Sequence, residues 1–237
     1  MNFNGKNILV VGASSGIGYQ LAKGLEASGA TVFTASRSKP KDLYAEFVQL
    51  DVTDEISEET FSSLPNELHG VVYCPGSINL KPFARLKAED FLADYRINVL
   101  GAVEVIQHTL SRLKQAGSSS VVLFSTVAVQ TGMNYHASIA AAKGAIEGLV
   151  RSLAAEFAGS SIRFNAIAPS LVDTPLAAKL LSSEEKRAAS DKRHPLGRVG
   201  KPEELAATAM FLLSDDASWM SGQVLALDGG MSSLKPL

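Results

Sequence analysis

Several side chains that can exchange a proton lie in the stretch 125–148. Lys143 carries an amine and Ser138 a hydroxyl. Tyr135 carries a phenol, and the imidazole of His136 belongs to the side-chain type that titrates near neutral pH. A positioned imidazole or phenol can act as a general acid. The alternative is that Tyr135 and His136 line a substrate pocket or contact a neighbouring subunit, and the sequence alone leaves both open.

A glycine-rich turn near the start of the chain has the pattern of a phosphate site. The apolar run 7–11 predicts a buried strand, Gly12 ends it, and apolar residues at helical spacing follow Gly18. Glycine lets the backbone approach a pyrophosphate, and the start of the helix offers free N–H groups. A tight turn without a ligand is the alternative. The candidate cofactor-binding residues of this turn are Gly12, Ser14, Ser15, Gly16, Ile17 and Gly18.

The second predicted strand, 31–35, ends in two residues that bear on the choice of nucleotide. In a dinucleotide site this strand end lies beside the adenosine ribose, where an acid accepts from the 2′-hydroxyl and repels a 2′-phosphate. Ser36 holds that position here and Arg37 follows, and a guanidinium suits a phosphate dianion. We therefore expect NADP(H) rather than NAD(H), with a solvated surface arginine as the alternative.

The rest of the chain alternates between strand and helix patterns. Such alternation predicts an α/β fold with a doubly wound parallel sheet, whose ligand lies at the carboxyl ends of the strands. Asp51 follows a strand and could either contact adenine or cap the next helix. Asn98 is a poor helix former inside a helical pattern at 88–115, and it could bond backbone or water within a site. Further strands are predicted at 47–50, 71–73, 121–124, 162–167 and 223–227.

Composition limits the class of protein. The 237 residues are 46% hydrophobic with a net charge of −2, which suits a globular domain and gives no reason to expect nucleic acid or membrane as partner. The single Cys74 cannot form an internal disulfide, and the apolar run within 1–11 is too short for a signal segment. We expect one cytoplasmic domain over 1–237 with a small-molecule substrate and no metal site. The polar, helix-prone residues 173–197 are expected to form a lid.

Taken together, these motifs resemble the short-chain dehydrogenase/reductase family over nearly the whole chain. The turn at 12–18 is similar to the family's TGxxxGxG loop, with Val11 in place of threonine. Asn98 resembles its catalytic asparagine, 165–174 the segment that holds the nicotinamide amide, and 221–230 its C-terminal signature. The resemblance implies a Rossmann-type, seven-stranded parallel sheet of order 3-2-1-4-5-6-7 with helices on both faces. It also implies a homotetramer or homodimer assembled through the long helices at 88–115 and 138–158.

The resemblance also assigns roles to individual residues. In the family a tyrosine gives a proton to the carbonyl oxygen as hydride arrives, a lysine four residues later holds the cofactor ribose, and a serine orients the carbonyl. Lys143 fits the lysine and Thr126 can replace the serine, but Ile139 stands at the tyrosine position. Beyond the glycine turn, the implied cofactor-binding residues are Ser36, Arg37, Asp51, Val52, Gly76, Asn98, Lys143, Pro169, Val172 and Thr174.

Two functions follow from this pattern. The first is an NADP(H)-dependent oxidoreductase that acts on a carbonyl, alcohol or imine with an altered proton donor, for which Asn98, Thr126 and Lys143 argue. The second is a nucleotide-binding protein that has lost turnover and serves as a cofactor-sensing or partner subunit, for which Ile139 argues because isoleucine cannot donate a proton. A shared fold does not name the substrate.

Overall fold

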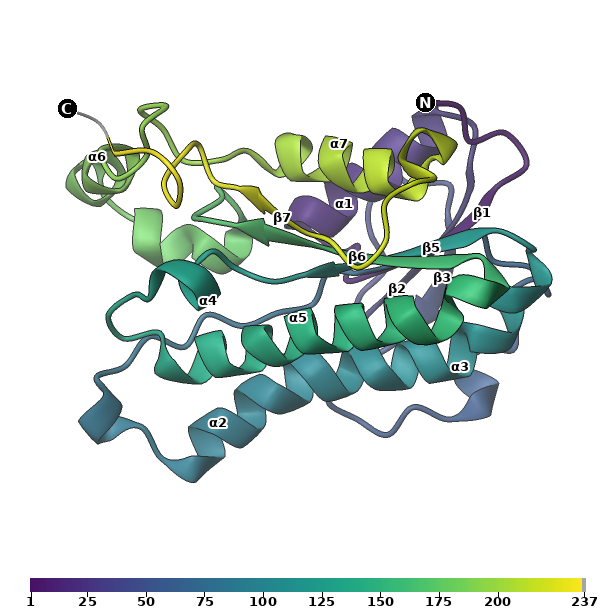
Figure 1. The fold of residues 1–237 in the computed structure, drawn as a ribbon, viewed down its shortest axis with the longest axis horizontal. Coiled ribbons are helices and arrows are strands. Elements are labelled where there is room, and N and C mark those ends of the chain that lie inside the picture. Colours follow the sequence, from purple (N-terminus) through teal and green to yellow (C-terminus); the bar gives the residue numbers. More distant parts are fainter. Residues whose placement is uncertain (236–237) are drawn as a thin grey trace.

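The computed structural model describes residues 1–235 and is built around a seven-stranded parallel sheet (Figure 1). The strand order is β3-β2-β1-β4-β5-β6-β7, as predicted, and each neighbouring pair is parallel. Short apolar runs such as that of β1 form these strands because both faces of the sheet are covered. The strands are β1 Asn7–Val11, β2 Thr31–Ser36, β3 Glu46–Gln49, β4 Gly70–Tyr73, β5 Ser119–Phe124, β6 Ile162–Pro169 and β7 Val224–Leu227.

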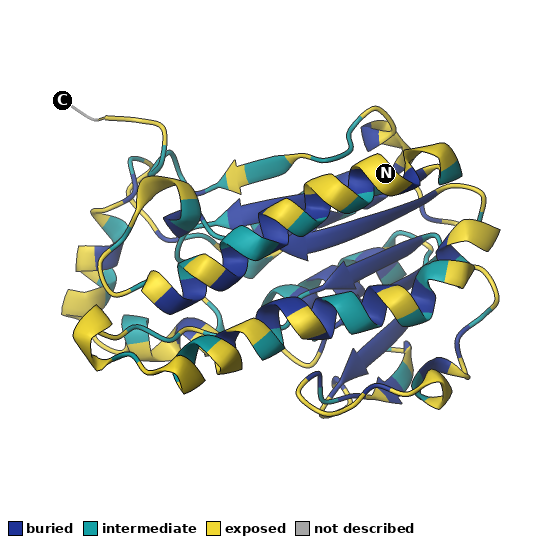
Figure 2. Ribbon diagram, turned by 60° about the horizontal axis from the view of Figure 1, so that its bottom comes forward, coloured by how far each residue is buried: buried dark blue, intermediate teal, exposed yellow. Residues whose placement is uncertain are grey.

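Helices cover the sheet in two layers. The core on one face joins the sheet to α3 and α5, and the core on the other face joins it to α1 and α7. Figure 2 shows the strands buried between helices that keep an exposed outer side. The helices are α1 Gly16–Ala27, α2 Ala88–Tyr95, α3 Gly101–Gln115, α4 Ala128–Thr131, α5 Ala137–Phe157, α6 Glu184–Asp191 and α7 Pro202–Leu213.

The helix predicted over 88–115 is interrupted in the middle. A π-helical turn, Arg96–Leu100, separates α2 from α3. Asn98 is buried in this turn and its Nδ2 donates to the backbone carbonyl of Asp94 at 2.8 Å. A π-turn releases carbonyls from the regular helical ladder, and the asparagine amide satisfies one of them. The poor helix former thus lies at a break in the helix, with its side chain buried.

The segment 173–197 leaves the carboxyl end of β6 and returns to the sheet through α7. It contains a 3₁₀ stretch, Pro175–Leu181, and then α6. Each begins at a hydroxyl cap, because Thr174 accepts from the Ala177 amide and Ser183 accepts from the Lys186 amide. Residues of this segment line the cavities described below, and its role as a lid stays a prediction.

Candidate functional site

The glycine-rich turn forms one side of a cavity of about 270 Å³ at the carboxyl ends of β1, β2 and β4. Gly12 and Gly16 have φ values of +83° and +58°, which favour glycine. A Cβ at Gly18 would collide with the Gly12 carbonyl oxygen. Ser15, at the N-terminus of α1, makes no side-chain cap, so the first amides of this helix are left for a ligand. The cavity and the glycines fit a dinucleotide phosphate.

The far edge of this cavity is lined by Ser36, Arg37, Asp51 and Val52, all four of which the sequence predicted. Ser36 is buried and donates to the Ser38 carbonyl at 2.9 Å, whereas Arg37 is exposed. Asp51 caps a turn rather than a helix, and its contact with adenine stays a prediction. It caps a turn by accepting from the Thr53 amide and hydroxyl, and it also lines the cavity. Hydrogen bonds from Thr53 hold the pKa of Asp51 below its usual value, and Arg37 adds a smaller lowering.

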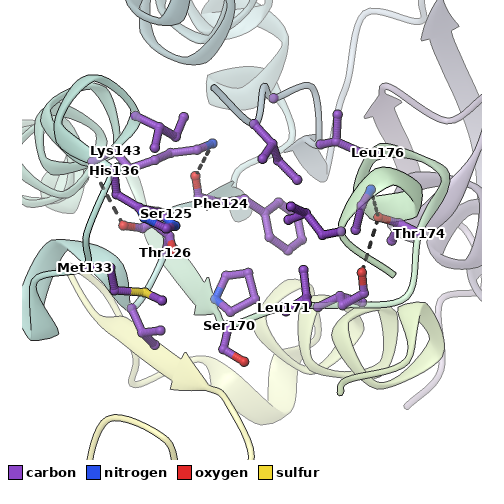
Figure 3. A pocket seen from close by; sticks show the side chains of 18 of the residues that line it. Phe124, Ser125, Thr126, Met133, His136, Lys143, Ser170, Leu171, Thr174 and Leu176 are labelled. Atoms are coloured by element: carbon purple, nitrogen blue, oxygen red, sulfur yellow. Dashed lines mark hydrogen bonds between the residues drawn. The ribbon is translucent and has the colours of Figure 1, made fainter. Parts of the chain in front are cut away.

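A second cavity, of about 290 Å³, lies at the carboxyl ends of β5 and β6 (Figure 3). Its wall is largely apolar, and Lys143, Thr126 and Ile139 all face it. It meets the first cavity at a shared border, so the two form one connected site. The residues that line both cavities are Ile17, Cys74, Gly76, Thr174 and Leu176.

Lys143 lies within the buried part of this site. Its side chain is 8% exposed, and Nζ donates to the Phe124 carbonyl at 2.8 Å, as the dashed line in Figure 3 shows. Burial lowers the pKa of Lys143 to about 8, and the nearby Asp94 opposes that shift. A Cβ added to Gly76 would lie 3.6 Å from Nζ and 3.3 Å from Asn98 Oδ1. The lysine and the asparagine therefore meet at the glycine that borders both cavities.

Asn98 belongs to a buried polar network that the sequence did not predict. Its Nδ2 donates to Ser77 Oγ at 2.8 Å, and Ser77 donates to Asp94 Oδ1 at 2.6 Å. Asp94 is 3% exposed and also accepts from Ser138 Oγ at 2.5 Å. Within residues 1–235, Asn98 Oδ1 is buried without a hydrogen-bond partner. An orphaned buried acceptor beside a lysine is a fitting place for a water or a ligand hydroxyl.

The two hydroxyls at the end of β5 have different surroundings. Ser125 is buried and donates to Glu147 Oε1 of α5 at 2.8 Å. Thr126 Oγ1 accepts from the Ala128 amide at 3.3 Å, and its residue lines the second cavity. Because an acceptor contact leaves the hydroxyl proton available, Thr126 can still donate to a substrate oxygen. Thr126 thus has the exposure to the cavity that its predicted role requires.

The candidate proton donors near α5 separate into three environments. His136 lines the second cavity, and its Nδ1 lies 2.7 Å from the Asn134 carbonyl. Tyr135 is 58% exposed, has a φ of +68° and is absent from the lining of both cavities. Ser138 is buried against Asp94 and Asp90 and does not line the second cavity. Of the three, the structure brings only His136 to the cavity.

The segment after β6 contributes the remaining predicted residues and two others. Pro169, Val172 and Thr174 all line the second cavity. Ser170 lies beside them and forms a hydrogen bond with Nε2 of His194, a residue that is 3% exposed. No sequence pattern pointed to His194, because it is 24 residues away from Ser170 and within a polar segment.

Two negative findings concern the described part of the chain. Residues 1–235 contain no group of three or more His, Cys, Asp or Glu side chains that could hold a metal ion. None of the helices described is both long and apolar enough to cross a membrane. Cys74 lines both cavities, and burial raises the pKa of its thiol to about 12, so it is a neutral thiol at ordinary pH.

Comparison with known proteins places this site in context. Residues 12–232 match the family model described as enoyl-(acyl carrier protein) reductase. The chain is 35% identical to a tropinone reductase homologue of Arabidopsis thaliana, over 98% of this chain and 94% of the relative. It is 33% identical to a 3-oxoacyl-(acyl-carrier-protein) reductase of Thermotoga maritima, over 98% and 99%. A structure of a candidate NAD(P)-dependent gluconate 5-dehydrogenase from Beutenbergia cavernae, with NADP at low occupancy, superposes with a TM-score of 0.90 at 30% identity, covering 97% of this chain and 98% of that one.

Proposed function

We propose a function from one premise, that this chain belongs to the short-chain dehydrogenase/reductase family. Its proposed activity is an NADP(H)-dependent oxidation or reduction of an alcohol, carbonyl or imine. When bound, the nicotinamide supplies or accepts the hydride. The observation that carries the proposal is the border between the two cavities, where a nucleotide site opens into an apolar site beside Lys143.

The residues at this border divide the proposed work among them. Lys143 would hold the ribose of the nicotinamide half, a task that its buried amine performs without a tyrosine. Thr126 would donate to the substrate oxygen and so orient it. Asn98 would hold a water through its orphaned Oδ1, next to Nζ of the lysine. None of these roles needs a hydroxyl at position 139.

Ile139 is the proposed departure from the family. It is 6% exposed, lines the substrate cavity and lies one helical turn before Lys143. We propose that it occupies the position of the family's tyrosine, so that another group exchanges the proton of the substrate oxygen. If no other group does so, the protein binds the nucleotide without turning over substrate, which is the competing function.

The cofactor proposed is NADP(H). Ser36 offers no carboxylate to repel a 2′-phosphate, and the exposed Arg37 lines the same edge of the cavity. The substrate proposed is a small molecule with an apolar body, because most of the cavity wall is apolar and Arg193 supplies a cation at its rim. The apolar lining includes Ile78, Leu80, Met133, Leu171, Leu180 and Met231.

We also propose that the protein forms a homotetramer or homodimer. A surface hollow runs between α2 and α5, with Leu92 68% exposed and Tyr95 41% exposed at its side. Small residues of α5, among them Ala141 and Ala142, line the same hollow and permit close approach of a second helix. An exposed apolar surface of this kind is typical of an interface.

The test of the proposed function is a turnover assay with defined probes. Purified protein is mixed with NADPH and either acetoacetyl-coenzyme A, tropinone or cyclohexanone, or with NADP⁺ and gluconate, and nicotinamide fluorescence is followed. We expect turnover of at least one probe, with Lys143→Met as the inactive comparison. Tight binding of NADPH with no turnover of any probe would favour the competing, non-catalytic function.

A further inference from the structure

A hydroxyl and an imidazole form a directed pair in the wall of the substrate cavity. His194 Nδ1 lies 2.8 Å from the carbonyl oxygen of Ser190, and Nε2 is hydrogen-bonded to Ser170 Oγ. A carbonyl oxygen only accepts, so Nδ1 carries the hydrogen. In the neutral ring Nε2 is then bare and accepts from the Ser170 hydroxyl. The backbone of α6 therefore fixes the tautomer that makes His194 a base toward Ser170.

The pair lies close to the residues that would hold the substrate oxygen. Ser170 follows Pro169 at the carboxyl end of β6, and the Pro169 carbonyl accepts from the Val127 amide at 3.1 Å. Val127 is the neighbour of Thr126, so the two hydroxyl residues flank one backbone hydrogen bond. Ser170, His194, Thr126 and Lys143 all line the same cavity. Figure 3 labels Ser170 and Thr126 among the residues that line this cavity.

Three charged side chains lie near His194, namely Asp228, Asp191 and Arg193. The pKa of Asp228 is lowered on balance. Burial raises it, but hydrogen bonds from Ser232 and Gly230 and the charge of His194 together lower it by more, so the carboxylate is ionised. Asp191 Oδ1 accepts a hydrogen bond from the Val199 amide at 2.8 Å. Arg193 is exposed and its Nη2 lies 3.2 Å from Ser190 Oγ.

We propose that Ser170 exchanges a proton with the substrate oxygen and that His194 exchanges it with Ser170, in place of the tyrosine that Ile139 replaces. This inference rests on the proposed function. In alcohol oxidation the substrate O–H bond breaks toward Ser170 Oγ, while the Ser170 proton moves to His194 Nε2. The hydrogen on the substrate carbon would leave with the two electrons of its bond, as a hydride that bound NADP⁺ would accept, and the products would be a carbonyl, NADPH and an imidazolium. Reduction is the reverse of each transfer.

The first test is independent of turnover. Long-range ¹H–¹⁵N spectra of the ¹⁵N-labelled NADPH complex report the tautomer of each of the four histidines, and His194→Gln identifies the signal of His194. We expect the neutral ring to carry its hydrogen on Nδ1, and the Nε2 shift to move in Ser170→Gly. A hydrogen on Nε2 in the neutral ring would overturn the proposal, because Ser170 could not then donate to it.

The second test uses whichever probe the wild type turns over. Ser170→Gly and His194→Gln should each lower turnover by about 10²–10⁴-fold with unchanged NADPH affinity. Ser170→Thr should retain activity, and His108→Gln on α3 serves as a remote histidine control. Wild-type oxidation should rise with pH as an imidazole loses its proton, and reduction should fall. The slope should vanish in His194→Gln, and a merely structural role would not change it.

Two results separate the failure of this inference from that of the proposed function. If the wild type turns over no probe, the proposed function fails, while the tautomer measurement still decides the pair. If Ser170→Gly and His194→Gln keep the wild-type rate and pH profile, the proposal is overturned. Loss of activity in Ser77→Ala and Asp94→Asn alone would then assign the proton to the network around Asn98.

Discussion

Replacing Arg37 with alanine should remove most of the preference for NADPH over NADH. Arg37 lines the edge of the first cavity and is exposed, and its charge lowers the pKa of Asp51 slightly. The side chain is therefore free to contact a 2′-phosphate, which NADPH has and NADH lacks. Arg37→Ala should weaken the binding of NADPH and leave the binding of NADH unaltered.

The expected size follows from the exposure of the guanidinium. A charge-assisted hydrogen bond contributes about 1.5–3 kcal/mol, and solvent screening at an exposed position favours the lower end. Because about 1.4 kcal/mol corresponds to a factor of ten, the NADPH dissociation constant should rise about tenfold. The effect should shrink at high salt for the same reason.

Fluorescence titration of both cofactors measures this change directly. Lys39→Ala removes an exposed cation two residues away that does not line the cavity, and it should alter neither affinity. Arg37→Lys keeps the charge and should fall between wild type and Arg37→Ala. Equal wild-type affinities for NADPH and NADH, or equal weakening of both by Arg37→Ala, would refute the assignment of Arg37 to the phosphate.

Three further predictions concern α5. Ile139→Tyr should raise the rate of carbonyl reduction by up to about 10²–10⁴-fold. Ile139→Phe, which has the same ring without the hydroxyl, should not raise it. Equal rates in the two variants would show that the tyrosine does not act as a proton donor. Because burial lowers the pKa of Lys143 from 10.5 to about 8, the unfolded chain binds more protons between those pH values. The unfolding free energy relative to Lys143→Met should therefore rise across that window by at most about 3 kcal/mol, and parallel denaturation curves would contradict it. Light scattering at micromolar concentration should show a dimer or tetramer, and Leu92→Glu on the facing α2 should shift it toward monomer; a monomeric wild type would exclude the proposed assembly.

The fold was predictable because each of its parts has a local signal. Apolar runs bounded by turns predicted all seven strands, most of them to within one or two residues, and the family resemblance supplied their order. The glycine turn was visible because glycine adopts φ values such as those at Gly12 and Gly16 more readily than other residues do. The helix over 88–115 was predicted as continuous, since the π-turn around Asn98 has no periodic signature of its own.

The candidate site was predictable only in part. Motif spacing found Lys143, Thr126 and Asn98. Lys143 and Thr126 line the second cavity, and Asn98 lies beside Gly76, which borders both cavities. Motif spacing did not find Asp94 or His194, because their partners lie in other segments and only the tertiary fold brings them into contact. The sequence predicted proton-exchanging groups at Tyr135 and His136, because both lie within four residues of Ile139. The pair that the structure offers instead crosses from β6 to the end of α6.

We propose above that this chain transfers hydride although position 139 carries isoleucine. Transfer of deuterium from NADPH labelled at C4 tests it most directly, with the product of each carbonyl probe examined by mass spectrometry. We expect the wild type to give a product that carries one deuterium on its carbinol carbon, and Ser170→Gly to give far less of that product. If no probe acquires deuterium at saturating concentrations of labelled NADPH, the proposed hydride transfer is contradicted. The protein would then only bind the nucleotide.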